Sequence, residues 1–181
     1  LSDTDMVLAA PPLAAKHGRV FLAARPTSPN IPAQVPKYLF LACFGDNVQA
    51  SAAAEWAYGN RSAQTAAIVF ESSKTYTRLL QGYFQARFEQ LGGRVVFHRG
   101  VTDESLHDAI DAVPDCDMVF LALEAPKDIA EAVSLLRGRG VSAPILGGDS
   151  FDAEKLWASH PEIDNVFFTT HAYLGDENKD P

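Results

Sequence analysis

The sequence predicts an α/β protein built on a doubly wound parallel sheet. Short apolar runs alternate with amphipathic helical segments, as expected for a parallel sheet covered by helices on both faces. The runs predict strands at 19–23, 38–42, 65–70, 94–98, 117–123, 143–146 and 165–170. Because these runs are continuously apolar rather than alternating, we expect every strand to be buried on both faces.

Helices are expected between the later strands. Segment 74–91 keeps apolar residues at helical spacing and is followed by two glycines, with Ser72 or Ser73 as its cap. Segment 126–139 starts with a proline, which suits the first helical turn, and 104–113 is a weaker candidate. Asp46 is placed to cap a further helix over 47–58.

The part of the chain before residue 43 has a different composition. A helix over 6–17 precedes the first predicted strand, and residues 24–37 contain four prolines, which argue against a helix or a central strand there. We therefore expect 24–37 to be a fixed loop or a crossover between lobes. A domain boundary is expected near 43–46, where the apolar run ends.

Composition and motifs exclude several classes of function. The 181 residues are 47% apolar, carry a net charge of -8 and show no Lys/Arg cluster that could follow a phosphate backbone, so nucleic acid is not an expected partner. No apolar run approaches the roughly 20 residues needed to span a bilayer. Neither a glycine-rich nucleotide motif, nor a nucleophile elbow, nor a metal-binding histidine or cysteine spacing is present. We expect no enzymatic activity, catalytic residue, cofactor or metal.

Four segments occur in an order that resembles a known family. They read "LAAKHGRVFLAARPTSP", "YLFLACFGDNVQASAAAEWAY", "AAIVFESSKTYTRLLQGYFQARFEQLGGRVV" and "PILGGDSFD". Together they resemble the central part of type I periplasmic binding proteins, in the branch of leucine/isoleucine/valine-binding proteins. The resemblance implies two Rossmann-like lobes joined by crossovers, with residues 1–43 as the end of the first lobe and its crossover, and 44–181 as most of the second.

The resemblance also implies a function. It predicts a solute receptor of an ABC importer, in the periplasm or outside the cell, with a small-molecule ligand and the membrane permease as partners. The expected ligand is an amphipathic metabolite held between the lobes, foremost a branched-chain or other apolar amino acid. The alternative is the same module as the ligand-sensing domain of a regulator or receptor that responds to amides or aromatic acids.

Two residues are the candidates for the amine side of this ligand. Asp149 follows the strand 143–146 after two glycines, which allow a close backbone approach at the end of the sheet where ligands bind. The resemblance implies that Asp149 pairs with an ammonium group. The alternative is a cap of the helix expected over 151–158, a role that Asp152 could also fill. Glu124 would supply a second acid for a more cationic ligand, or else stand beside the helix start at 126.

Other residues are candidates for the remaining ligand contacts. The resemblance implies that Thr27, with Arg25, receives a carboxylate, although Pro26 removes one backbone donor; the alternative for Arg25 is a solvent-facing position. Tyr76 would cover the ligand, or else belong to the apolar stripe of its helix. His171 follows the last strand at the same end of the sheet and could line a cleft or face solvent.

The last expectations concern the hinge and the N-terminus. Asp46 and Gln49 resemble the family's hinge pattern and would join the crossovers by polar contacts, allowing the lobes to close on a ligand. The resemblance implies that Ser2 or Thr4 makes a second contact with the ligand carboxylate. The neighbouring Asp3 and Asp5 would repel that carboxylate. Tyr173 is a further cleft candidate beside His171.

Overall fold

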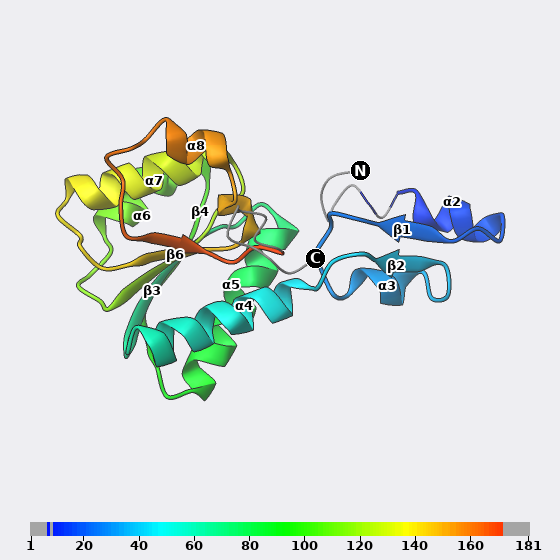
Figure 1. The fold of residues 1–181 in the computed structure, drawn as a ribbon, viewed down its shortest axis with the longest axis horizontal. Helices are drawn as coiled ribbons and strands as arrows, with labels where there is room; N and C mark the ends of the chain where they lie inside the picture. Colours follow the sequence, from blue (N-terminus) through cyan, green and yellow to red (C-terminus); the bar gives the residue numbers. More distant parts are fainter. Residues whose placement is uncertain (1–6, 8, 172–181) are drawn as a thin grey trace, which may run out of the picture.

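A five-stranded parallel sheet forms the body of the molecule (Figure 1). The structure is a computed structural model and describes residues 7 and 9–171. The first elements are α2 (Pro11–Lys16), β1 (Phe21–Ala23), α3 (Ile31–Gln34) and β2 (Leu39–Leu41). They are followed by α4 (Asp46–Glu55), a π-helical turn (Trp56–Asn60), β3 (Thr65–Glu71), α5 (Thr75–Gln90), β4 (Arg94–Val101), α6 (Leu106–Asp111), β5 (Met118–Ala122), α7 (Pro126–Gly138), β6 (Ile145–Gly147), α8 (Glu154–Ala158) and β7 (Val166–Phe168).

The strand order in this sheet is β4-β3-β5-β6-β7, and every pair is parallel. The predicted α/β class with a doubly wound parallel sheet is therefore confirmed. The chain leaves β3 toward β4 on one side and returns to β5 on the other. The connections thus diverge between β3 and β5, which makes this the switch point where open α/β sheets bind ligands.

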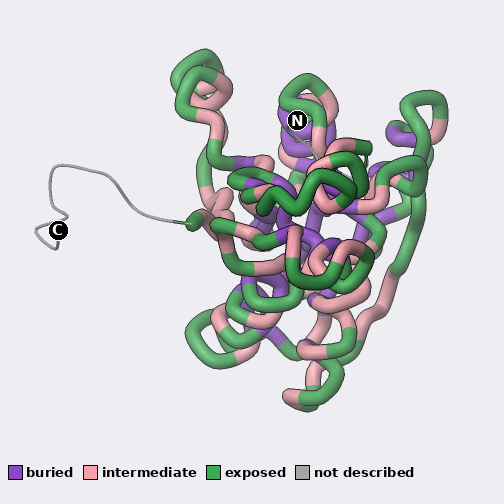
Figure 2. The backbone as a smooth tube through the Cα atoms, turned by 90° about the vertical axis from the view of Figure 1, so that its right-hand side faces the viewer, coloured by how far each residue is buried: buried purple, intermediate pink, exposed green. Residues whose placement is uncertain are grey.

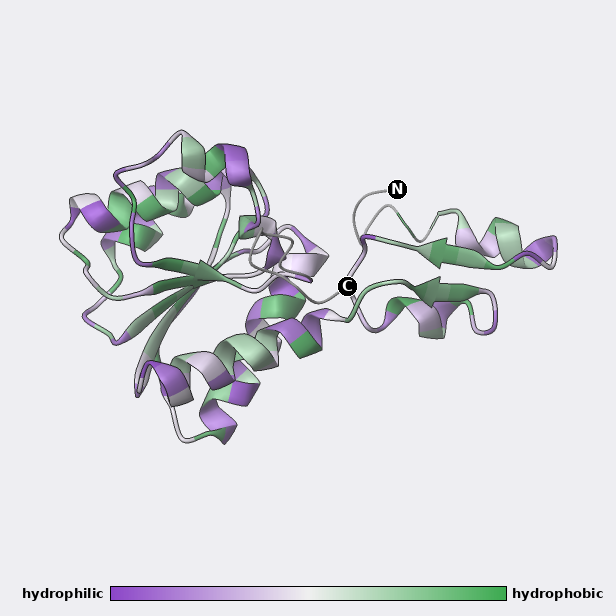
Figure 3. Ribbon diagram, in the orientation of Figure 1, coloured by the Kyte–Doolittle hydropathy of each residue, from purple (hydrophilic) through white to green (hydrophobic). Residues whose placement is uncertain are grey.

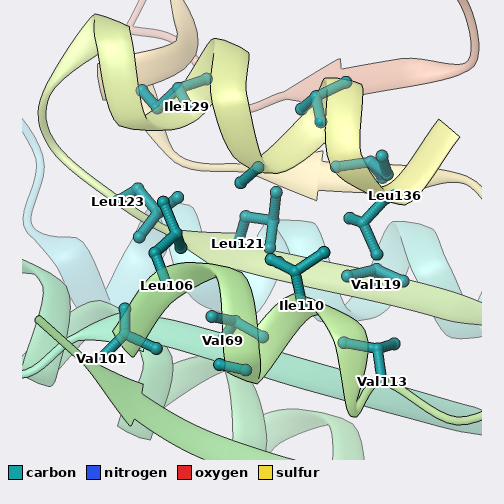
Figure 4. Packing of buried hydrophobic residues seen from close by; sticks show 14 of the residues in the cluster. Val69, Val101, Leu106, Ile110, Val113, Val119, Leu121, Leu123, Ile129 and Leu136 are labelled. Atoms are coloured by element: carbon teal, nitrogen blue, oxygen red, sulfur yellow. The ribbon is translucent and has the colours of Figure 1, made fainter. Parts of the chain in front are cut away.

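Two apolar layers hold the sheet between its helices. Alternate residues of one strand point to opposite faces, so Val69 of β3 packs with α6 and α7, whereas Ile68 packs with α4 and α5. Figure 4 shows the first layer, with Val119 and Leu121 of β5 beneath α7. In the second layer, Phe84 and Phe120 are fully buried and stack with ring centroids 3.9 Å apart. Figure 2 shows the buried segments gathered in the interior, with most of the loops exposed.

Residues 7 and 9–41, the N-terminal arm, project from this body as a two-stranded parallel sheet with α2 and α3 (Figure 1). A small core of Val7, Ala23, Ile31 and Leu39 holds it together. The other face is open, and Leu22 is 63% exposed although its strand is apolar (Figure 3). No helix of the described residues has both the length and the apolar character needed to cross a membrane.

Four expectations about local structure were wrong. β5 and β6 are buried on both faces, but β1 and β2 expose one residue each, and the sheet-edge strand β4 is largely exposed because only one neighbour covers it. The proline-rich segment contains the four-residue helix α3, because Pro32 lies in the first turn, where no backbone donor is needed. The N-cap of α4 is Gly45 rather than Asp46, and that of α5 is Lys74 rather than a serine.

Candidate functional site

The carboxyl ends of the parallel strands and the arm enclose a pocket of about 610 Å³. The segments after β3, β5, β6 and β7 each contribute to one wall, as the switch-point topology requires. The loop after β1 contributes the opposite wall. The lining residues are Ala24, Arg25, Pro26, Thr27, Tyr76, Glu124, Pro126, Asp149, Ser150, Asp152, Ala153, Thr170 and His171. All of the predicted ligand-binding residues in the described chain therefore line one pocket, although their contacts with a ligand remain predictions.

Asp149 lies at the centre of a polar network in this pocket. Its Oδ1 accepts hydrogen bonds from the Tyr76 hydroxyl at 2.6 Å and from Gln49 Nε2 at 3.1 Å, and its Oδ2 lies 3.3 Å from His171 Nε2. Its side chain is 23% exposed, so it stays open to the pocket. Asp149 does not cap α8, whose N-cap residue is Ala153 without a side-chain cap bond.

Gly148 permits this arrangement because it leaves room for the Tyr76 hydroxyl. A Cβ atom at Gly148 would lie 2.5 Å from Tyr76 Oη and 2.6 Å from Leu80 Cδ2, closer than such contacts allow. The backbone of β6 thus approaches α5 closely, and Tyr76 can reach the next residue, Asp149. The paired glycines of the sequence indicated a close approach, but the groups that approach are protein side chains.

Gly148→Ala should therefore disturb both folding and the pocket. Moving Tyr76 and Leu80 should lower the free energy of unfolding by about 1 to 2 kcal/mol and break the Tyr76–Asp149 hydrogen bond. Urea denaturation measures the effect. Gly82→Ala is the matched control, because nothing lies within 4 Å of the added methyl group and alanine favours the interior of α5. Equal unfolding free energies for the two variants would contradict this role of Gly148.

Tyr76 belongs to the apolar stripe of its helix and also lines the pocket, the two positions that the sequence allowed. It is 8% exposed and packs in the apolar layer of α5, yet its hydroxyl reaches the pocket. Burial, together with the neighbouring Asp149 carboxylate, raises its pKa well above the ordinary value. The hydroxyl therefore stays protonated and donates to Asp149, while its contact with a ligand remains a prediction.

Gln49 connects the segments that meet below the pocket. Its Nε2 donates to Asp46 Oδ1 at 3.0 Å and to Asp149 Oδ1 at 3.1 Å. Its Oε1 accepts from the backbone N–H of Asp149 at 3.1 Å and from the Thr169 hydroxyl at 3.0 Å. One buried amide thus joins the start of α4 to the ends of β6 and β7. This geometry suits the predicted hinge pair, whose movement remains a prediction.

Asp46 is the other member of this pair and is fully buried. Its backbone N–H donates to the Thr27 carbonyl at 2.8 Å, which ties the arm to α4. Burial raises the pKa of Asp46 from 3.8 to about 6, against smaller lowering effects of the Thr27 and Gln49 side chains. Its Oδ2 has no hydrogen-bond partner within the described part of the chain.

The two walls of the pocket carry opposite charge. Arg25 is exposed and is the only arginine or lysine among the described lining residues, on the wall formed by the arm. Thr27 is buried beside it, near Asp46. Glu124 lies on the opposite wall with Asp149 and Asp152, and its Oε2 is 3.8 Å from Lys74 Nζ, which offsets part of its charge.

The sequence reading missed part of the lining. Thr170 donates to Asp152 Oδ2 at 2.5 Å, and the Ser150 hydroxyl donates to the Leu123 carbonyl at 2.6 Å. For Ser150 the available signal was its place beside Asp149, shortly after a strand, whereas Thr170 was hidden because the predicted strand 165–170 included it. His171, an open alternative, does line the pocket. The predictions for Ser2, Thr4 and Tyr173 lie outside the described residues.

Comparison with solved structures identifies the class of fold. The chain has the type I periplasmic binding protein fold, as its resemblance to that family implied. No protein-family model matches the sequence, and no curated protein sequence does.

The similar structures are ligand-binding components of transporters. One is the substrate-binding protein LivJ of Streptococcus pneumoniae with isoleucine, at 19% identity and a TM-score of 0.81 over 98% of this chain and 52% of that one. The leucine-binding protein LivK of Thermotoga maritima has 26% identity and a TM-score of 0.81 over 96% and 50%. A solute-binding protein of R. palustris in complex with 4-hydroxybenzoate has 18% identity and a TM-score of 0.75 over 88% and 45%. The chain spans about half the length of these structures.

Proposed function

We propose that the chain forms most of the second lobe and part of the first lobe of an ABC importer's solute receptor, working in the periplasm or outside the cell. It would hold a small amphipathic metabolite between the lobes, foremost a branched-chain or other apolar amino acid, and deliver it unchanged to the membrane permease. We also propose that the first lobe with its crossover ends at residue 43 and that the second lobe begins at residue 44. The similar structures of LivJ with isoleucine and of the leucine-binding protein LivK support this class of ligand.

The observation that carries the proposal is the opposite charge of the two pocket walls. Arg25 on the arm suits a carboxylate, because its guanidinium can donate two parallel hydrogen bonds. Asp149 on the body suits an ammonium group, and Tyr76 with Gln49 holds its carboxylate in place. An α-amino acid carries both charges, so each wall offers a partner for one of them. Glu124 would then lie beside its amine or its side chain.

Arg25 also supports a second ligand class. An aromatic acid has a carboxylate for Arg25, and its phenolic hydroxyl could donate to Asp149 in place of an amine. The R. palustris protein with 4-hydroxybenzoate has the same fold, which makes this class worth testing beside amino acids.

A thermal-shift panel tests the proposed function. A ligand that binds only the folded state must raise the melting temperature of the chain. L-leucine and L-isoleucine should raise it, glucose should not, and mass spectrometry should recover the bound amino acid unchanged. If only 4-hydroxybenzoate raises the melting temperature, the ligand class is the aromatic acids and not the amino acids. Chemical conversion of a ligand would contradict a purely binding function.

A further inference from the structure

The two oxygens of the Asp149 carboxylate have different surroundings. Oδ1 already accepts two hydrogen bonds, from the Tyr76 hydroxyl and from Gln49 Nε2. Both donors are buried, so Oδ1 is committed to the protein. Oδ2 has His171 Nε2 at 3.3 Å, on the side that lines the pocket. A ligand amine that approaches Asp149 at Oδ2 must therefore share this oxygen with His171 or displace it.

His171 is held in this place from two directions. It follows β7, and its ring lies 4.7 Å from the ring of Phe44, which follows β2. The imidazole therefore contacts the chain segment that joins the arm to the body. Its side chain is 36% exposed against 23% for Asp149, and both residues line the pocket.

We infer that His171 is a specificity-determining residue, whose protonated imidazole occupies Asp149 Oδ2 and competes with the amine of a ligand. The inference rests on the proposed function. When the imidazole is neutral, it makes an ordinary hydrogen bond that a cationic amine can displace. When it is protonated, it forms an ion pair with Asp149 and adds a positive charge to the place where the amine must bind. Amino-acid affinity should then fall as the pH falls.

Several charged or titratable groups surround His171. Asp149 is its direct partner, and Asp46 lies near enough for His171 to lower its pKa. Glu124 and Asp152 line the same pocket, and Arg25 is the cation of the opposite wall. Tyr76 stays protonated, so its charge does not change over the range concerned. Asp46 is the other group near His171 that changes charge near neutral pH, because its pKa is raised to about 6.

The same competition separates the two ligand classes. An aromatic acid brings no ammonium group, and its carboxylate and ring are not repelled by a protonated imidazole. Its phenolic hydroxyl would still share Oδ2 with His171, but without charge repulsion, so its affinity should fall less than that of an amino acid as the pH falls. His171 would thus favour amino acids above neutral pH and reduce that preference in acid.

Isothermal titration with L-leucine and 4-hydroxybenzoate tests the inference. The wild-type chain should bind L-leucine about three- to tenfold more weakly at about pH 5.5 than at about pH 8, because histidine side chains in general gain their charge over this range. His171→Gln keeps a neutral hydrogen-bond donor, and its affinity for L-leucine should change less than about twofold over that range. Far-ultraviolet circular dichroism checks that the variant is folded.

Each other outcome has a separate meaning. Binding of L-leucine that does not depend on pH in the wild type overturns the inference and leaves the proposed function standing. An equal pH dependence in His171→Gln also overturns it, and assigns the effect to Asp46, which that variant keeps. Absence of any bound ligand at either pH overturns both the inference and the proposed function.

Discussion

Asp149→Asn should weaken the binding of L-leucine by about 5- to 150-fold, corresponding to about 1 to 3 kcal/mol. The substitution removes the negative charge that would pair with the amine but keeps the size of the side chain. The amide oxygen of the new side chain can still accept hydrogen bonds from Tyr76 and Gln49, so the pocket should keep its shape. Isothermal titration at about pH 8 measures the change.

Asp152→Asn is the matched control for this prediction. Asp152 is also an acid of the pocket wall, but its Oδ2 is hydrogen-bonded by Thr170 and it lies outside the network of Gln49. Its removal changes the net charge of the pocket by the same amount as removal of Asp149. A loss of affinity shared equally by both variants would show a general effect of charge, and an unchanged dissociation constant for Asp149→Asn would refute the ion pair.

Asp46→Asn should raise the free energy of unfolding by about 1 to 3 kcal/mol at pH 7 to 8. The rise of the Asp46 pKa from 3.8 to about 6 corresponds to roughly 3 kcal/mol. The folded state binds the proton more tightly than the unfolded state, so this contribution is favourable below about pH 3.8 and is lost as the pH rises through about 6. The helix dipole at the start of α4 favours the ionised form of Asp46. Loss of this favourable interaction in the variant is the reason why the expected gain in unfolding free energy extends down to about 1 kcal/mol.

The pH dependence separates this explanation from a packing effect. Asparagine is neutral at every pH, so the variant and the wild type should differ most at pH 7 to 8 and converge by about pH 4. Chemical denaturation at several pH values measures both curves. A constant difference at all pH values would show that burial of the Asp46 charge is not its cause. Ligand affinity should be measured in parallel, because Gln49 connects Asp46 with Asp149.

The body of the fold could be predicted because its signals are local. The run over 117–123 is continuously apolar, and β5 is indeed buried on both faces at the centre of the sheet. The same reasoning failed at β4, since a strand's place in the sheet depends on its neighbours in space and not on its own residues. The predictions of helix N-caps were wrong for a related reason. Asp46 has the residue type of a cap, but its side chain bonds to Gln49 instead.

The candidate site could be predicted in part. Asp149 and Tyr76 were identified from the resemblance to a known family, and their positions after strands, at the edge where parallel strands end together, agreed with it. The bond between their side chains could not be predicted, because they are 73 residues apart and meet only where Gly148 leaves space. The same holds for His171, whose partner depends on how the chain returns after β7.

The sequence by itself determined the parallel α/β fold and the strand ends that carry polar side chains, because these follow from hydrophobic periodicity and from residues next to one another in the chain. The tertiary structure decided which of those side chains meet. It joined Asp46, Gln49 and Asp149 into one network, placed His171 on the remaining carboxylate oxygen and buried Asp46 completely. Hydrogen bonds and pKa values depend on distance and burial, which only the folded chain defines.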